Sequence, residues 1–110
     1  MDVPQAAPSE LRIVVRPYPG GPVTTWTLTC DPPAGTHPDP AGACRALDAA
    51  RDPFAPVPAD LLCTQVYGGP ETAEITGTWH GAPVSATYRR TDGCEIARWA
   101  ALAAVLAPGN

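Results

Sequence analysis

Four cysteines in a chain of 110 residues constrain the fold more than any other feature of the sequence. They are Cys30, Cys44, Cys63 and Cys94. No two of them have the C-x2-C spacing of a zinc or redox motif, which argues against a metal site. An even number of cysteines in a short chain favours two disulfides in a secreted protein. Four cysteines allow three pairings. We favour Cys30–Cys44 and Cys63–Cys94, because sequence neighbours close short loops.

Charge and composition exclude several classes of protein. Eleven acidic residues against seven basic ones give a net charge of −4, and the basic residues form no cluster. This pattern excludes binding to nucleic acid or to an anionic membrane surface. No apolar run approaches the roughly 20 residues that span a bilayer. Fifteen prolines and ten glycines predict many loops and turns around a single domain.

Four segments have the pattern of β-strands. Residues 11–16 are rich in β-branched side chains and end at Pro17, and residues 24–30 alternate apolar and polar side chains. Residues 72–79 and 83–90 predict a hairpin around His80-Gly81-Ala82, in which Gly81 supplies a positive φ.

Two segments favour helices. Asp39 and Pro40 have the types expected at an N-cap and a first helical position, and they predict a helix over 41–51 that ends at Asp52-Pro53. Residues 95–106 favour a helix by intrinsic propensity. The sum is an α+β domain over 10–110, preceded by a disordered tail over 1–9. Residues 1–9 lack the apolar core of a signal peptide, so we expect a mature sequence with an added Met1.

The residues that could perform catalysis do not form a recognisable active site. The two serines fall in the predicted tail (Ser9) and in a predicted strand (Ser85), and both histidines, His37 and His80, fall in loops. Glu71 and Glu74 are interpreted as solvated carboxylates at a strand edge. No lysine is present for a phosphate-binding loop. We therefore predict that the chain is not an enzyme and needs no cofactor or metal.

The segment from Leu62 to Pro70, LCTQVYGGP, contains a cysteine and is closed by glycine and proline. One interpretation is a surface connection that a disulfide ties down. The other is a rigid, extended and exposed peptide that a protease binds but does not cut productively. The residues alone leave both interpretations open.

Several motifs, in one order along the chain, resemble the Streptomyces subtilisin inhibitor family. They are Thr27-Leu28-Thr29-Cys30, Gly35-Thr36-His37-Pro38, Ala43-Cys44-Arg45-Ala46-Leu47, Cys63-Thr64-Gln65-Val66-Tyr67, Gly77-Thr78-Trp79-His80-Gly81, Thr87-Tyr88-Arg89-Arg90 and Cys94-Glu95. The resemblance covers residues 11–94 and includes all four cysteines.

This resemblance implies a five-stranded antiparallel sheet with two short helices, and it supports the cysteine pairing given above. It also implies a secreted, extracellular inhibitor that forms a homodimer packed sheet to sheet. The expected partner is a subtilisin-like serine protease. The C-terminal end favours a helix, against the family pattern, but we expect tertiary context to keep a final strand near residues 103–106.

The resemblance further implies a reactive-site loop in which a protease would attack the bond between Gln65 and Val66. Its residues would be Leu62 (P4), Cys63 (P3), Thr64 (P2), Gln65 (P1), Val66 (P1′) and Tyr67 (P2′). Gly68-Gly69 departs from the family pattern and predicts a looser primed side. Two alternatives remain: an inhibitor of another extracellular protease, such as a metalloprotease, through another surface, and a non-inhibitory disulfide-stabilised binding domain.

Overall fold

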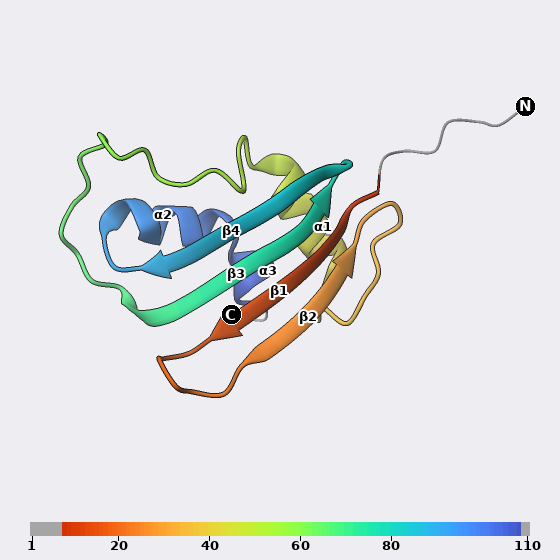
Figure 1. The fold of residues 1–110 in the computed structure, drawn as a ribbon, viewed down its shortest axis with the longest axis horizontal. Helices are drawn as coiled ribbons and strands as arrows, with labels where there is room; N and C mark the ends of the chain where they lie inside the picture. Colours follow the sequence, from red (N-terminus) through yellow and green to blue (C-terminus); the bar gives the residue numbers. More distant parts are fainter. Residues whose placement is uncertain (1–7, 109–110) are drawn as a thin grey trace, which may run out of the picture.

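An antiparallel sheet with strand order β2-β1-β3-β4 forms one layer of the molecule, and the helices form the other (Figure 1). This computed structural model describes residues 8–108. The strands are β1 (Glu10–Arg16), β2 (Thr24–Thr29), β3 (Gly69–Trp79) and β4 (Ala82–Arg90), and the helices are α1 (Pro40–Ala49), α2 (Gly93–Ala101) and α3 (Ala103–Leu106). All four predicted strands are present at their predicted places, with ends shifted by one to three residues.

The core lies between the sheet and the helices. Alternate strand residues such as Leu11, Ile13 and Ile75 are buried on one face, as period-2 side-chain geometry requires. Leu47 of α1 and Trp99 of α2 cover them from the helical layer. The opposite face of the sheet carries mostly exposed polar side chains.

The expected five-stranded sheet with two helices is wrong, although the α+β class is correct. The described residues form four strands and three helices, and residues 103–106 are helical. Leu102, Val105 and Leu106 are all fully buried, at the spacing that places side chains on one helical face. A strand would direct Val105 and Leu106 to opposite sides. Helix propensity and burial therefore agree in this alanine-rich segment.

Local signals at the hairpin and at α1 are confirmed. His80 and Gly81 both have positive φ, at 50° and 83°, as a two-residue hairpin turn requires. Asp39 caps α1, because its Oδ1 accepts a hydrogen bond from the Gly42 N–H at 3.1 Å. The helix ends at Ala49, two residues before the predicted end.

The predicted disordered tail, residues 1–9, lies mostly outside the described residues. Its last two residues contact the β3–β4 hairpin. Ser9 is only 4% exposed, and its Oγ accepts a hydrogen bond from the His80 N–H at 2.9 Å. The carbonyl of Pro8 accepts a hydrogen bond from the Gly81 N–H at 2.9 Å.

The outer edge of β2 is covered by the loop that follows it. Thr29 and Ala34 exchange two backbone hydrogen bonds, of 2.9 and 3.0 Å. The carbonyl of Thr27 accepts a hydrogen bond from the His37 N–H at 3.1 Å. The Thr27 N–H donates to Thr36 Oγ1 at 2.8 Å. These contacts satisfy backbone groups that an edge strand would otherwise expose.

The disulfide pairing predicted from short loops is confirmed, because Cys30 bonds to Cys44 and Cys63 bonds to Cys94. The first bridge links the segment after β2 to α1. The second links the 62–67 segment to the start of α2. Among the described residues, none of the helices has the length and apolar character needed to cross a bilayer.

Tyr88 makes the stability of this core depend on pH in the alkaline range. The residue is 2% exposed, and its hydroxyl donates a 2.7 Å hydrogen bond to the carbonyl of Pro53. Burial raises the pKa of Tyr88 to about 12, against a smaller lowering effect of the Arg98 guanidinium. The folded protein therefore holds this proton after the unfolded chain has released it. The stabilisation of the folded state by protonated Tyr88 is complete below pH 10 and is lost as the pH rises from 10 to about 12.

We expect the free energy of unfolding to fall by about 2–3 kcal/mol across this range. Urea unfolding at a series of pH values measures it, and Tyr88→Phe is the control because it removes the titrating hydroxyl. Subtracting the Tyr88→Phe curve from the wild-type curve isolates the contribution of Tyr88. Identical slopes for the two proteins would contradict the assignment.

Candidate functional site

The predicted site residues lie together in the extended segment between α1 and β3, at one end of the molecule (Figure 1). The segment from Leu62 to Tyr67 contains no helix or strand, and we call it the 62–67 loop. Leu62 is 96% exposed, Val66 is 56% exposed and Tyr67 is 66% exposed. Thr64 and Gln65 are also exposed, whereas Cys63 is half-buried. Such exposure of large apolar side chains is typical of a surface that contacts a partner.

Residues 90–94, which we call the supporting turn, hold this loop on both sides of the Gln65–Val66 bond. On the N-terminal side, Cys94 is bonded to Cys63, and the Gly93 N–H donates a 2.9 Å hydrogen bond to the Thr64 carbonyl. On the C-terminal side, the Gly68 N–H donates a 2.7 Å hydrogen bond to the Arg90 carbonyl. The Gln65–Val66 bond therefore lies between anchors that share one support.

The C-terminal base of the loop is fixed by an ion pair that the sequence analysis missed. Glu71, which was interpreted as solvated, pairs with Arg90, and both side chains are about one-third exposed. The Glu71 carboxylate occupies the space that a Cβ at Gly69 would need, and Gly69 has a φ of 143° that favours glycine. The ion pair therefore lies directly beneath the point where the loop enters β3.

The glycines after Tyr67 allow a close approach to the scaffold. A Cβ at Gly68 would lie 2.8 Å from Ile96 Cγ1 of α2. Gly68 is also hydrogen-bonded to Arg90, so the absence of a side chain brings its backbone against the supporting turn. The expectation of a looser primed side is therefore wrong at Gly68, because the residue is tightly packed.

Polar side chains lie behind the 62–67 loop. Glu95 accepts hydrogen bonds from Arg89 at 3.1 Å and from Arg98 at 3.3 Å, and Asp92 caps α2 through the Glu95 N–H. A cavity of about 570 Å³ separates these groups from the loop. The Gln65 side chain donates a 3.3 Å hydrogen bond to the Cys63 carbonyl. The Gln65 side chain, which was predicted to be P1, is therefore folded back onto its own loop.

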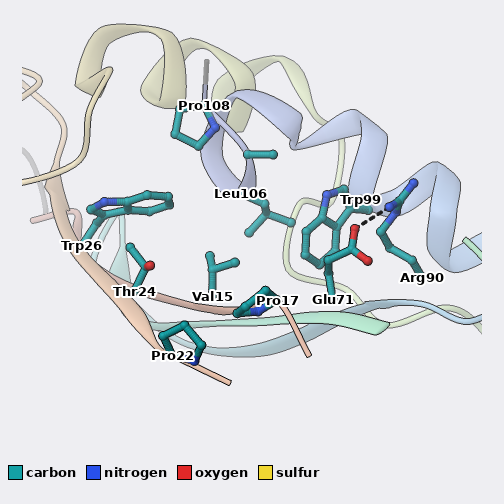
Figure 2. Close-up of a pocket in the computed structure, with 11 residues that line it drawn as sticks. Val15, Pro17, Pro22, Thr24, Trp26, Glu71, Arg90, Trp99, Leu106 and Pro108 are labelled. Carbon is teal, nitrogen blue, oxygen red and sulfur yellow. Dashed lines mark hydrogen bonds and ion pairs between the residues drawn. The ribbon is translucent and has the colours of Figure 1, made fainter. Parts of the chain in front are cut away.

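A second cavity lies between the sheet and α2 and is shown in Figure 2. It has a volume of about 520 Å³, and Trp26, Trp99 and Leu106 form its apolar walls. The Glu71–Arg90 ion pair closes one end. No residue of the 62–67 loop lines it. This cavity therefore borders the base of the loop but is separate from the predicted site.

The described residues that could act in catalysis do not form a nucleophile–base pair, because Ser9 Oγ is hydrogen-bonded to the backbone N–H of His80 and not to its ring. His37 is buried, with Nε2 bonded to the Val105 carbonyl and Nδ1 accepting from the Asp39 N–H. His80 lies on the surface, 3.9 Å from Asp48. The one cluster of potential metal ligands in the described part of the chain is Cys63, Asp92 and Cys94. Its two sulfurs are bonded to each other, so they offer no thiolate to a metal.

The comparisons with known proteins point to a single family. Residues 7–91 match the family described as subtilisin inhibitor-like. A subtilase-type protease inhibitor of Streptomyces coelicolor is 41% identical over 76% of this chain and 58% of its own length. Kexstatin-1 of Streptomyces platensis is 39% identical over 64% of this chain and 50% of its own length.

One further relative and one solved structure differ in the kind of protease that the relative's name and the structure's title give. A transglutaminase-activating metalloprotease inhibitor of Streptomyces mobaraensis is 36% identical over 64% of this chain and 49% of its own length. The chain thus spans about half the length of these curated relatives. Among solved structures, Streptomyces caespitosus sermetstatin in complex with Bacillus licheniformis subtilisin has a TM-score of 0.52 and 27% identity, covering 83% of this chain and 90% of that chain.

Proposed function

The chain belongs to the subtilisin inhibitor-like family, and on this premise we propose that it inhibits a subtilisin-like serine protease through the 62–67 loop. Gln65 is the P1 residue and Val66 the P1′ residue. Membership of the family agrees with the prediction that the chain is not an enzyme. The sermetstatin neighbour, whose structure is a complex with subtilisin, supports a protease as partner.

The observation that supports this proposal best is the supporting turn. If a protease cleaves the Gln65–Val66 bond, Thr64 remains hydrogen-bonded to Gly93, and Gly68 remains hydrogen-bonded to Arg90. The new amine of Val66 therefore stays beside the acyl group. Holding two reacting groups together raises their effective concentration by many orders of magnitude, so religation competes with hydrolysis. A flexible substrate loop would release its ends and lose this advantage.

Binding would use backbone as well as side-chain contacts. The loop pairs as an added strand with the substrate cleft, and main-chain hydrogen bonds supply much of the affinity. The Cys63–Cys94 disulfide removes part of the ordering cost on binding. Leu62, which is almost fully exposed, offers an apolar P4 side chain. Complexes of this class bury about 1,600 Å² and can still be very tight.

The side chain of Gln65 sets the expected specificity. An uncharged amide does not satisfy the S1 aspartate of a trypsin-type protease. A closed apolar S1 pocket would desolvate the amide at a cost of about 1–3 kcal/mol if it stayed unpaired. The open, partly solvated S1 site of subtilisins avoids most of this cost. We therefore expect tight inhibition of subtilisins, weak inhibition of chymotrypsin and negligible inhibition of trypsin.

A stoichiometric titration of subtilisin at low nanomolar enzyme tests the proposal. We expect complete inhibition near one chain per enzyme, because the loop is already ordered by the supporting turn. Mass spectrometry of the mixture should find intact chain together with chain nicked between Gln65 and Val66. Rapid degradation, or no inhibition at a thousandfold excess, would contradict the proposal.

A second candidate function is inhibition of a metalloprotease through another surface, and the name of the Streptomyces mobaraensis relative supports it. Gln65→Pro separates the two, because a proline at P1 blocks productive binding of the loop in a serine protease cleft. Metalloprotease inhibition that survives this substitution would favour the second function. A non-inhibitory binding domain predicts that subtilisin ignores the loop or cuts it and releases the pieces.

Secretion and homodimer formation, both expected from the family resemblance, stay predictions. The face available for sheet-to-sheet packing carries Arg12 on β1 and Glu74 on β3, with half-buried Val14 between them. Across a twofold axis, Arg12 of one copy can pair with Glu74 of the other, and the two Val14 side chains can pack together. Sedimentation equilibrium at micromolar concentration measures the dimer, and a single species of 11.4 kDa would contradict it.

A further inference from the structure

The backbone of Gly93 packs directly against Thr64. The Gly93 N–H donates to the Thr64 carbonyl at 2.9 Å. On the same side, a Cβ placed on Gly93 would overlap Thr64 Oγ1 and would lie 3.3 Å from Thr64 Cβ. The side chain of Thr64 thus fills the space that a side chain at residue 93 would occupy.

Backbone conformation does not explain the glycine at this position. Gly93 is the first residue of α2 and does not have a left-handed φ, so any residue could adopt its conformation. Asp92 already caps the helix through the Glu95 N–H at 2.9 Å. Alanine would even favour the helix more than glycine does. A side chain at residue 93 is therefore opposed by the space that Thr64 occupies and not by the backbone conformation.

The bond to Thr64 also matters for the chemistry at its neighbour. The first N–H groups of a helix have no partner within the helix, and the Thr64 carbonyl satisfies that of Gly93. Thr64 immediately precedes Gln65, so a shift of its carbonyl moves the carbonyl carbon that a protease would attack. A β-branched threonine has few rotamers with which to avoid a new neighbour.

We propose that Gly93 is a positioning residue for the reactive bond, and that residues 64 and 93 form a matched pair. A threonine at P2 is compatible with tight inhibition because residue 93 has no side chain. This inference rests on the proposed function, and it adds a specificity determinant outside the 62–67 loop. In this proposal Gly93 acts on the reactive bond through Thr64.

Three variants form the core of the test: Gly93→Ala, Thr64→Ala and the double variant. We expect Gly93→Ala to weaken subtilisin inhibition and to accelerate hydrolysis between residues 65 and 66, each on the order of 100-fold, because the attacked bond is misplaced. Thr64→Ala removes a side chain of the proposed binding loop, so it serves as the reference for the double variant and not as an unchanged protein. Adding Gly93→Ala to it should change either quantity by less than about threefold, because the overlapping Oγ1 is gone.

A valine at residue 64 provides the matched control. Thr64→Val keeps the branched Cβ and places a methyl group near the position of Oγ1, so it should not rescue Gly93→Ala. The melting temperature of Gly93→Ala should stay within about 5 °C of the wild type, because the better helix propensity of alanine offsets the lost hydrogen bond. A Gly93→Ala protein that inhibits like the wild type, or a Gly93→Ala change that costs as much in the Thr64→Ala background as in the wild type, would overturn the inference.

Amide hydrogen exchange at residue 93 in the free protein separates this inference from the proposed function. We expect protection of this N–H in the wild type, loss of protection in Gly93→Ala and its return in the double variant. If subtilisin is not inhibited but this pattern is observed, the proposed function fails while the matched pair stands. If inhibition is observed but residue 93 exchanges equally fast in all variants, only the matched pair fails.

Discussion

Replacing Gln65 with lysine is expected to convert the chain into an inhibitor of trypsin. The side chain is exposed, and its one hydrogen bond, to the Cys63 carbonyl, is long at 3.3 Å, so little structure is lost. A lysine at P1 would pair with the S1 aspartate that glutamine leaves unpaired. Sites built around such a polar partner discriminate by a factor on the order of 10⁴, and we expect the trypsin inhibition constant to fall by that factor.

The measurement is the inhibition constant of Gln65→Lys for trypsin and for subtilisin. Val66→Lys is the matched control, because it places the same charge one residue further along the same exposed loop. It should leave trypsin uninhibited, since the charge then faces the primed side of the cleft. Two inert variants, or two equally potent ones, would remove Gln65 from the P1 position.

Removal of the Cys63–Cys94 disulfide is expected to change the chain from an inhibitor into a substrate. The Cys63→Ser, Cys94→Ser variant removes the covalent anchor at residue 63, which is next to Thr64. Hydrolysis between residues 65 and 66 should then go to completion. The disulfide spans 31 residues, so the chain-entropy relation gives a loss of about 4 kcal/mol in the free energy of unfolding.

The other disulfide offers a control of similar energetic size. The Cys30–Cys44 bridge spans 14 residues, and its removal by serine substitution should cost about 3 kcal/mol. It links the segment after β2 to α1, away from the 62–67 loop, so inhibition should persist wherever that variant is folded. Circular dichroism identifies a temperature at which both variants are folded, and the cleavage assay is run there. Equal loss of inhibition in both would mean that general stability, not the loop anchor, controls inhibition.

The strands were predictable because their signals are local. The side chains of Thr24–Thr29 alternate between apolar and polar, and Gly81 marks the hairpin turn. Asp39 and Pro40 mark the start of α1 in the same local way. The position of β1 between β2 and β3 has no such local signal, because it depends on pairing between distant segments. Helix propensity correctly predicted a helix over residues 103–106, whereas the family resemblance predicted a strand there. A helix can bury Val105 and Leu106 together, and a strand cannot.

The exposed part of the candidate site was also predictable, whereas its support was not. Cys63 and the closing glycines mark the loop in the sequence. The Gly93 N–H and the Arg90 carbonyl act through backbone atoms, which almost every residue has, so no side-chain pattern identifies them. Glu71 was assigned to solvent because its partner lies 19 residues away in the sequence.

The covered edge of β2 has a consequence for the surroundings in which a protease works. A protease digesting unfolded proteins is surrounded by extended peptides, and exposed sheet edges recruit such peptides as additional strands. Because residues 34–37 already occupy hydrogen-bonding positions of Thr27 and Thr29, that part of the edge has few groups left to offer. Along this edge the domain is therefore a poor template for partly digested chains, which would need those same groups to add a strand.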